Sequence, residues 1–126
     1  MSKEKFSFHK RLRSFGYAFN GLKILIKEEH NARIHLLAAV IAIIAGFYFH
    51  ISTVEWIAIV FAIGFVIALE IVNSAIENMA DFVSPEWHST IKKIKDLAAA
   101  GVLISSITAL IIGLIIFLPK ILYFCL

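Results

Sequence analysis

Long uncharged stretches dominate the pattern of hydrophobic and polar positions along this chain. Asp, Glu, Lys and Arg are absent from three runs: residues 34–54, 56–69 and 97–119. A helix needs about 20 apolar residues to cross a hydrocarbon core of about 30 Å. The pattern therefore predicts an all-α membrane protein with three transmembrane helices, at residues 31–50, 53–79 and 96–118.

The segments between these helices are short. We expect a turn at residues 51–54 and a longer loop at residues 81–91, where Pro85 disfavours helix. Pro119 and Lys120 are expected to end the third helix. The connections predict a compact unit, so we treat residues 1–126 as one domain.

The segment before the first span has a different periodicity. Its apolar residues recur at steps of three and four: Phe8, Leu12, Phe15, Phe19, Leu22 and Ile26. Basic and polar side chains lie between them, which predicts an amphipathic helix over residues 5–28 at the membrane surface. Its role is either that of an anchor or that of part of a site.

The composition agrees with this pattern. The chain has 126 residues, of which 60% are hydrophobic and only 17% are charged, and this excludes disorder and most soluble folds. Cys125 is the single cysteine, so an internal disulfide or a CxxC metal site is excluded.

The distribution of Lys and Arg predicts the orientation of the chain. Eight of the twelve occur up to Arg33, and three more, Lys92, Lys93 and Lys95, precede the third span. Because cytoplasmic segments carry the excess of Lys and Arg, the N-terminus is expected in the cytoplasm and the C-terminus outside. The net charge of +3 therefore indicates membrane orientation, and no nucleic-acid partner is expected.

One face of the second span is acidic and polar. Its members are Glu70, Asn73, Ser74, Glu77 and Asp81. At 1.5 Å per residue, Glu70 lies about 20 Å into the bilayer and about 10 Å from the cytoplasmic edge. A glutamate at this depth should be protonated, paired or functional. Alternatively, the Glu70 side chain could form a hydrogen bond to a neighbouring helix and have a purely structural role.

Near the cytoplasmic edge, the residues predict binding of a metal ion and of a phosphate group. Glu77 beside Glu29 and Asp81 would offer the oxygen ligands that Mg²⁺ prefers. The basic N-terminal helix and Lys92, Lys93 and Lys95 could hold a polyphosphate, although lysines at such positions often only determine topology.

Small residues recur every four positions in the third span. They are Gly101, Ser105, Ala109 and Gly113. Such a ridge lets helices approach closely, within the chain or between copies of it.

The run Glu70-Ile-Val-Asn-Ser-Ala-Ile-Glu77 resembles the prokaryotic diacylglycerol kinase family, which also includes undecaprenol kinases. Two further segments resemble it: Lys95-Asp96 before the third span and Glu29-His-Asn-Ala-Arg33 before the first. The resemblance extends from about residue 10 to residue 117. It implies a homotrimer in the bacterial inner membrane, with active sites between subunits that face the cytoplasm.

The resemblance also implies an activity, namely transfer of the γ-phosphate of ATP, with Mg²⁺, to the hydroxyl of diacylglycerol or undecaprenol. Glu70 matches the catalytic base, supported by Asn73, while Glu29 and Glu77 match metal ligands. The positions similar to ATP contacts are Lys10, Tyr17, Glu29, Glu77, Glu86, His88, Lys95 and Asp96. Those near lipid contacts are Asn31, Arg33, Glu70 and Ala99. Lys10 stands where the family often has an arginine, and a lysine cannot bind phosphate bidentately.

Two other functions remain open from the residues alone. An intramembrane carboxylate is also typical of a small proton- or ion-coupled transport subunit. However, residues 57–69 provide no polar relay from Glu70 to the outer face. A purely structural protein would use the acidic face for helix packing.

Overall fold

The computed structural model describes residues 5–126, which form four helices joined by short segments. The helices are α1 Phe8–Glu28, α2 His30–Tyr48, α3 Thr53–Val83 and α4 Ser89–Cys125. The last three are long and apolar enough to cross a membrane. The prediction of an all-helical protein with three such segments is therefore confirmed.

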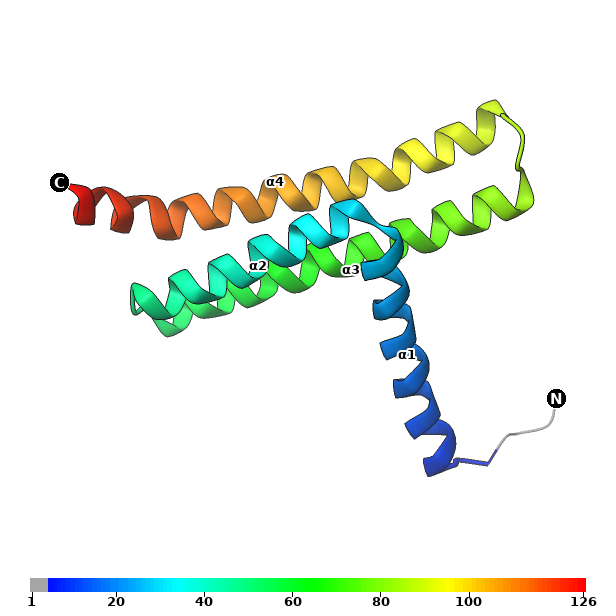
Figure 1. The fold of residues 1–126 in the computed structure, drawn as a ribbon, viewed down its shortest axis with the longest axis horizontal. Coiled ribbons are helices and arrows are strands. Elements are labelled where there is room, and N and C mark those ends of the chain that lie inside the picture. Colours follow the sequence, from blue (N-terminus) through cyan, green and yellow to red (C-terminus); the bar gives the residue numbers. More distant parts are fainter. Residues whose placement is uncertain (1–4) are drawn as a thin grey trace.

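The three apolar helices run side by side, and α1 leaves them at a steep angle (Figure 1). The most extensive packing is between α3 and α4, α2 packs against α3, and α1 touches α2 and α3. Thus α3 is the central helix of the bundle. The end of α3 and the start of α4 extend together beyond the point where α1 joins α2 (Figure 1).

Local sequence signals explain where most helices begin. The Ser7 side chain accepts a hydrogen bond from the Lys10 N–H at the start of α1. Ser52 and Glu55 form a capping box at the start of α3. Each arrangement satisfies backbone N–H groups that have no partner within the helix.

Pro119 does not end the last helix, contrary to the prediction. α4 continues through it to Cys125. A proline removes only one helical hydrogen bond, and leaving the helix in an apolar environment would expose many backbone groups. In addition, Lys120 Nζ binds Glu55 at 2.7 Å and the Ile116 carbonyl at 3.3 Å, which ties this end of α4 to α3.

The loop expected at residues 81–91 is shorter than predicted. α3 continues to Val83 and α4 begins at Ser89. Ser84 leaves the helical conformation immediately before Pro85, as expected for a residue that precedes proline. His88 caps the next helix, because its Nδ1 accepts a hydrogen bond from the Thr90 N–H at 3.1 Å.

The predicted ridge of small residues faces the interior of the bundle. Ser105 is fully buried, and Gly101, Ala109 and Gly113 are partly buried. In contrast, most large apolar side chains of α2, α3 and α4 are exposed. This distribution is typical of helices that face lipid or other membrane helices.

Candidate active site

The buried face of α3 carries the predicted base. Val66, Glu70 and Ser74 follow one another at steps of four and are all buried, with Glu70 only 2% exposed. Residues four apart lie on one side of a helix, so this side chain faces the bundle and not the membrane. Glu70 interacts electrostatically with both Glu29 and Glu77.

Glu29 approaches this face from the junction of α1 and α2. It is the one residue between the two helices, and its backbone N–H binds the Leu25 carbonyl at 3.0 Å. Its Oε1 accepts a hydrogen bond of 3.4 Å from the Ser74 hydroxyl. The break between α1 and α2 therefore holds Glu29 against α3, close to Glu70.

Two buried oxygens of the site make no hydrogen bond within residues 5–126. They are Glu70 Oε1 and Asn73 Oδ1. Both atoms are acceptors, and a buried acceptor that accepts no well-aligned hydrogen bond is costly. The pair is suited to a ligand that brings a hydroxyl group.

His35 of α2 is the functional neighbour that the sequence interpretation missed. Its Nε2 lies 3.2 Å from Glu70 Oε1 and 3.4 Å from the hydroxyl oxygen of Ser106 in α4. The sequence did contain a signal, because His35 is an ionisable residue inside an apolar span, and such residues usually pair with another polar group in the helix bundle. Sequence alone did not indicate that the partner was Glu70.

Arg33, an expected lipid contact, binds the end of α1. Its Nε donates to the Ile26 carbonyl at 2.6 Å, and its Nη2 donates to the Lys27 carbonyl. These bonds satisfy two of the carbonyls left free at a helix C-terminus. Two further expected lipid contacts, Asn31 on α2 and Ala99 on α4, are exposed.

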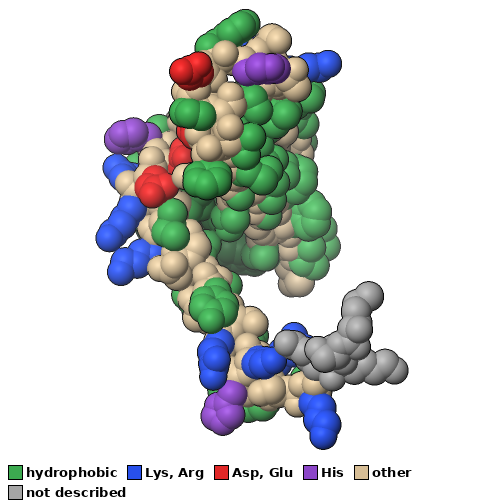
Figure 2. Space-filling view, turned by 90° about the vertical axis from the view of Figure 1, so that its right-hand side faces the viewer, with side chains coloured by type: hydrophobic (Ala, Val, Ile, Leu, Met, Phe, Trp, Pro, Cys, Tyr) green, Lys and Arg blue, Asp and Glu red, His purple; other side chains and the backbone are tan. Residues whose placement is uncertain are grey.

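Three expected ATP contacts meet at the connection between α3 and α4. Glu86, His88 and Lys95 line a hollow of about 260 Å³. Lys95 Nζ binds Asp81 at 2.5 Å, and both residues line the hollow. Asp96 is not part of the lining, but it binds Lys92, which is, at 2.6 Å. Figure 2 views the molecule from this end.

Two further expected ATP contacts lie on α1. Lys10 and Tyr17 are exposed, and α1 runs away from the connection between α3 and α4 (Figure 1). Lys and Arg side chains gather along α1, whereas the adjoining flank of the bundle is hydrophobic (Figure 2). One chain by itself therefore does not bring these two residues to the hollow.

The site fits a metal ion only in part. Glu29 and Glu77 both lie near Glu70 and offer the oxygen ligands that Mg²⁺ prefers. Asp81, expected beside them, is paired with Lys95 instead. Within residues 5–126, no group of three or more His, Cys, Asp or Glu side chains could hold a metal. The two glutamates would need further ligands, and Mg²⁺ commonly takes these from phosphates and water.

Comparison with known proteins agrees with the resemblance. The family model for prokaryotic diacylglycerol kinase matches residues 16–117. The chain is 38% identical over 108 residues to an undecaprenol kinase of Bacillus subtilis, covering 86% of this chain and 88% of that protein.

Two diacylglycerol kinases are also similar. The Synechocystis protein is 33% identical over 110 residues, covering 86% of this chain and 63% of the relative. The Escherichia coli protein is 27% identical over 111 residues, covering 88% of this chain and 91% of the relative. With its apolar helices and the match over most of its length, the chain belongs to the prokaryotic diacylglycerol kinase family of membrane lipid kinases.

Proposed function

We propose that this protein transfers the γ-phosphate of ATP to the hydroxyl of a membrane lipid alcohol, with Glu70 as the general base. The observation that carries the proposal is the buried Glu70, whose Oε1, like Asn73 Oδ1 on the same helix, makes no hydrogen bond with any of the residues that the structure describes. A substrate hydroxyl at this position would donate to a carboxylate oxygen, which is the contact that a general base requires.

The residues around Glu70 have separate roles in this proposal. Glu29 and Glu77 hold Mg²⁺, and Glu86, His88, Lys95 and Asp96 contact ATP, joined by Lys10 and Tyr17. Asn31, Arg33 and Ala99 contact the lipid. When bound, Mg²⁺ neutralises charge on the phosphates. Phosphoryl transfer depends mainly on such charge stabilisation and on positioning, and the chain supplies the positioning through α3.

The depth of Glu70 supports a lipid as the acceptor. Glu70 and Glu77 are seven residues apart on one helix, which corresponds to about 10 Å along its axis. Glu70 therefore lies where a bilayer alcohol would arrive, and Glu77 lies nearer the water. Of the two candidate alcohols, the greater identity to an undecaprenol kinase favours undecaprenol over diacylglycerol.

We further propose that the enzyme is a homotrimer with active sites between subunits. α1 leaves the bundle (Figure 1), and neither Lys10 nor Tyr17 is among the residues that line the hollow of their own chain. A second chain would bring them there, with α1 lying on the cytoplasmic surface of the inner membrane. The mass of the purified protein in detergent, measured by sedimentation, should correspond to three chains, and a monomer would contradict the assembly.

The activity can be tested with purified protein in mixed micelles containing labelled ATP, Mg²⁺ and either undecaprenol or diacylglycerol. We expect phosphorylated lipid from the unaltered protein. Glu70→Gln should still bind ATP but lose at least about 100-fold in kcat, the usual contribution of a general base. Near-normal turnover by this variant would remove Glu70 from the proposed role.

Reconstituted vesicles separate this function from ion transport. A transport subunit would move protons or ions across the vesicle membrane without phosphorylating lipid. The apolar groove that begins at His35 and Ser106 supports no such transport, because most of its lining is Ala, Ile, Val and Leu, which cannot relay protons. A proton flux without lipid phosphorylation would contradict the kinase proposal.

A further inference from the structure

The side chain of His35 joins α2 to both α3 and α4. Its Nε2 is 3.2 Å from Glu70 Oε1 and 3.4 Å from Ser106 Oγ. We propose that His35 is a positioning residue of the kinase reaction, which together with Ser106 holds the Glu70 carboxylate in the orientation that accepts the substrate proton. This inference rests on the proposed function of Glu70.

The hydrogen bonds of Ser106 assign the direction of the contact. Its hydroxyl donates to the Val102 carbonyl at 2.8 Å, which uses its only proton. With that proton used, Ser106 Oγ accepts from His35 in the tautomer that has a proton on Nε2. The same N–H lies beside Glu70 Oε1 and provides a polar partner for a carboxylate in an apolar span.

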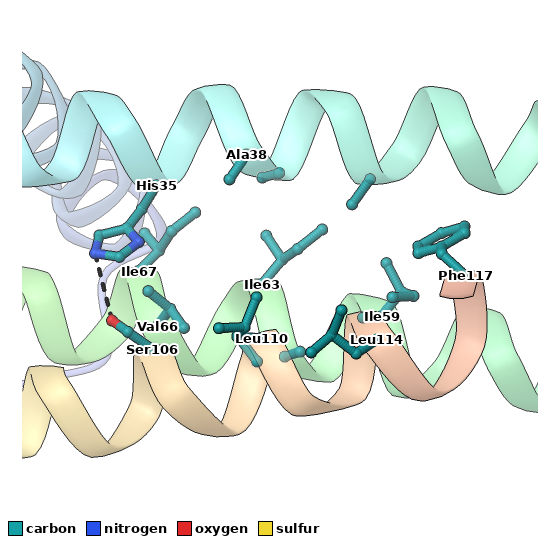
Figure 3. A pocket seen from close by; sticks show the side chains of 15 residues that line it. His35, Ala38, Ile59, Ile63, Val66, Ile67, Ser106, Leu110, Leu114 and Phe117 are labelled. Atoms are coloured by element: carbon teal, nitrogen blue, oxygen red, sulfur yellow. Dashed lines mark hydrogen bonds between the residues drawn. The ribbon is translucent and has the colours of Figure 1, made fainter. Parts of the chain in front are cut away.

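The geometry leaves Glu70 available for chemistry. His35 is close to Oε1, but this oxygen forms no aligned hydrogen bond within the described chain. The hydrogen bond of His35 Nε2 is made with Ser106 Oγ instead, and a dashed line marks it in Figure 3. Glu70 is thus held next to a donor while one of its oxygens can still accept a proton from a substrate hydroxyl.

The contact lies at one end of an apolar groove. His35 and Ser106 are polar members of a lining otherwise made by apolar side chains of α2, α3 and α4, and the groove has a volume of about 390 Å³ (Figure 3). With few other polar groups to hold Glu70, loss of His35 should let the carboxylate rotate. The charged groups that also act on Glu70 are Glu29 and Glu77. Both are carboxylates, so neither can replace the donor.

Kinetics of lipid phosphorylation provide the first test. His35→Leu should lower kcat by about 10- to 100-fold, the range expected when a reactive group is misplaced by about 1 Å. The KM for ATP should stay within about twofold, since ATP is proposed to bind at the far end of α3. His35→Gln, whose amide nitrogen falls near the position of Nε2, should lose less than about threefold.

Ser106 provides a second, milder variant with a matched control. Ser106→Ala should lower kcat, and in the His35→Leu background it should cause no further loss, because coupled residues are not additive. Thr108→Val is the control, because Thr108 is exposed on the same helix and its hydroxyl, like that of Ser106, donates to a backbone carbonyl, but it lies away from His35. It should keep the activity of the unaltered protein.

A spectroscopic measurement tests the contact without turnover. In ¹⁵N-histidine-labelled protein in nanodiscs, the ring nitrogen signals of His35 should shift in Glu70→Gln and in Ser106→Ala, while those of His50 stay in place. Unchanged His35 signals in both variants would overturn the inference even if the protein is an active kinase.

The kinetic measurements can also contradict the positioning role of His35. Full kcat in His35→Leu, equal losses in Ser106→Ala and Thr108→Val, or no rescue by His35→Gln would each contradict the positioning role. If His35→Leu does not fold, His35→Gln, Ser106→Ala and the spectra decide. An unaltered protein that phosphorylates no lipid alcohol would instead overturn the proposed function, and with it this inference.

Discussion

Glu70 and Glu77 occupy the same helix face but differ in surroundings. Glu70 is 2% exposed and lies among His35, Ser74 and other residues of the bundle, whereas Glu77 is only partly buried. A buried carboxylate is suited to proton transfer, and a partly exposed carboxylate is suited to binding a hydrated cation. The two proposed roles therefore follow from two positions seven residues apart.

A substitution of Glu77 tests the proposed metal ligands. Glu77→Gln keeps the size of the side chain but removes its charge, so the Mg²⁺ concentration for half-maximal activity should rise on the order of tenfold. Titration of Mg²⁺ at fixed ATP and lipid measures this value. Glu28→Gln serves as the control, because Glu28 is exposed at the end of α1, beside the proposed ligand Glu29. An unchanged Mg²⁺ requirement in Glu77→Gln would exclude this residue as a ligand.

At the scale of elements, the turn between α2 and α3 sets the relative position of these helices. Gly46 is buried beneath the ring of Trp56, which also contacts Phe47 at a centroid distance of 4.9 Å. A Cβ at position 46 would lie 2.6 Å from Trp56 Cη2 and 3.1 Å from Ile51 Cδ1. Glycine is therefore required here for close approach of the two helices.

Gly46→Ala should consequently destabilise the protein. The added methyl group must displace the Trp56 ring, and overpacking of this kind costs about 1–3 kcal/mol. Thermal unfolding in detergent, followed by circular dichroism, measures the loss. Gly64→Ala is the matched control in α3, because a Cβ there meets no atom within 4 Å. Equal stability of the two variants would show that the Trp56 contact is not tight in solution.

At the scale of the whole molecule, the bundle separates two chemically different ends. The junction of α1 and α2 and the connection between α3 and α4 lie toward one end, and the turn between α2 and α3 lies at the other (Figure 1). The excess of Lys and Arg occurs toward the first end. This distribution predicts that the proposed active site faces the cytoplasm.

The single cysteine makes this orientation measurable. Cys125 is exposed at the end of α4, on the side predicted to face outward. A membrane-impermeant maleimide added to intact cells should therefore label the unaltered protein. In the control, Cys125→Ser combined with Ser7→Cys, labelling should occur only after permeabilisation. The reverse result would invert the proposed topology.

Sequence reasoning predicted the three apolar helices because lipid imposes a simple requirement on length and hydrophobicity. It placed Glu70 and Ser74 on one face because helix periodicity is regular. It wrongly predicted that the last helix ends at Pro119, and it predicted too long a loop between α3 and α4. At both places the surroundings of the chain outweigh the local conformational preference of the residues. It also missed His35, because a contact between helices depends on how they rotate against each other.

The sequence by itself thus determined the membrane spans, the family and the intramembrane acid, since these depend on local pattern and on a run of specific residues. Only the tertiary structure decided which groups surround that acid. Packing of α2 and α4 against α3 brings His35 and Ser106 together, although they are 71 positions apart in the chain. Contacts of this kind arise from the burial of whole helix faces, and no local pattern encodes them.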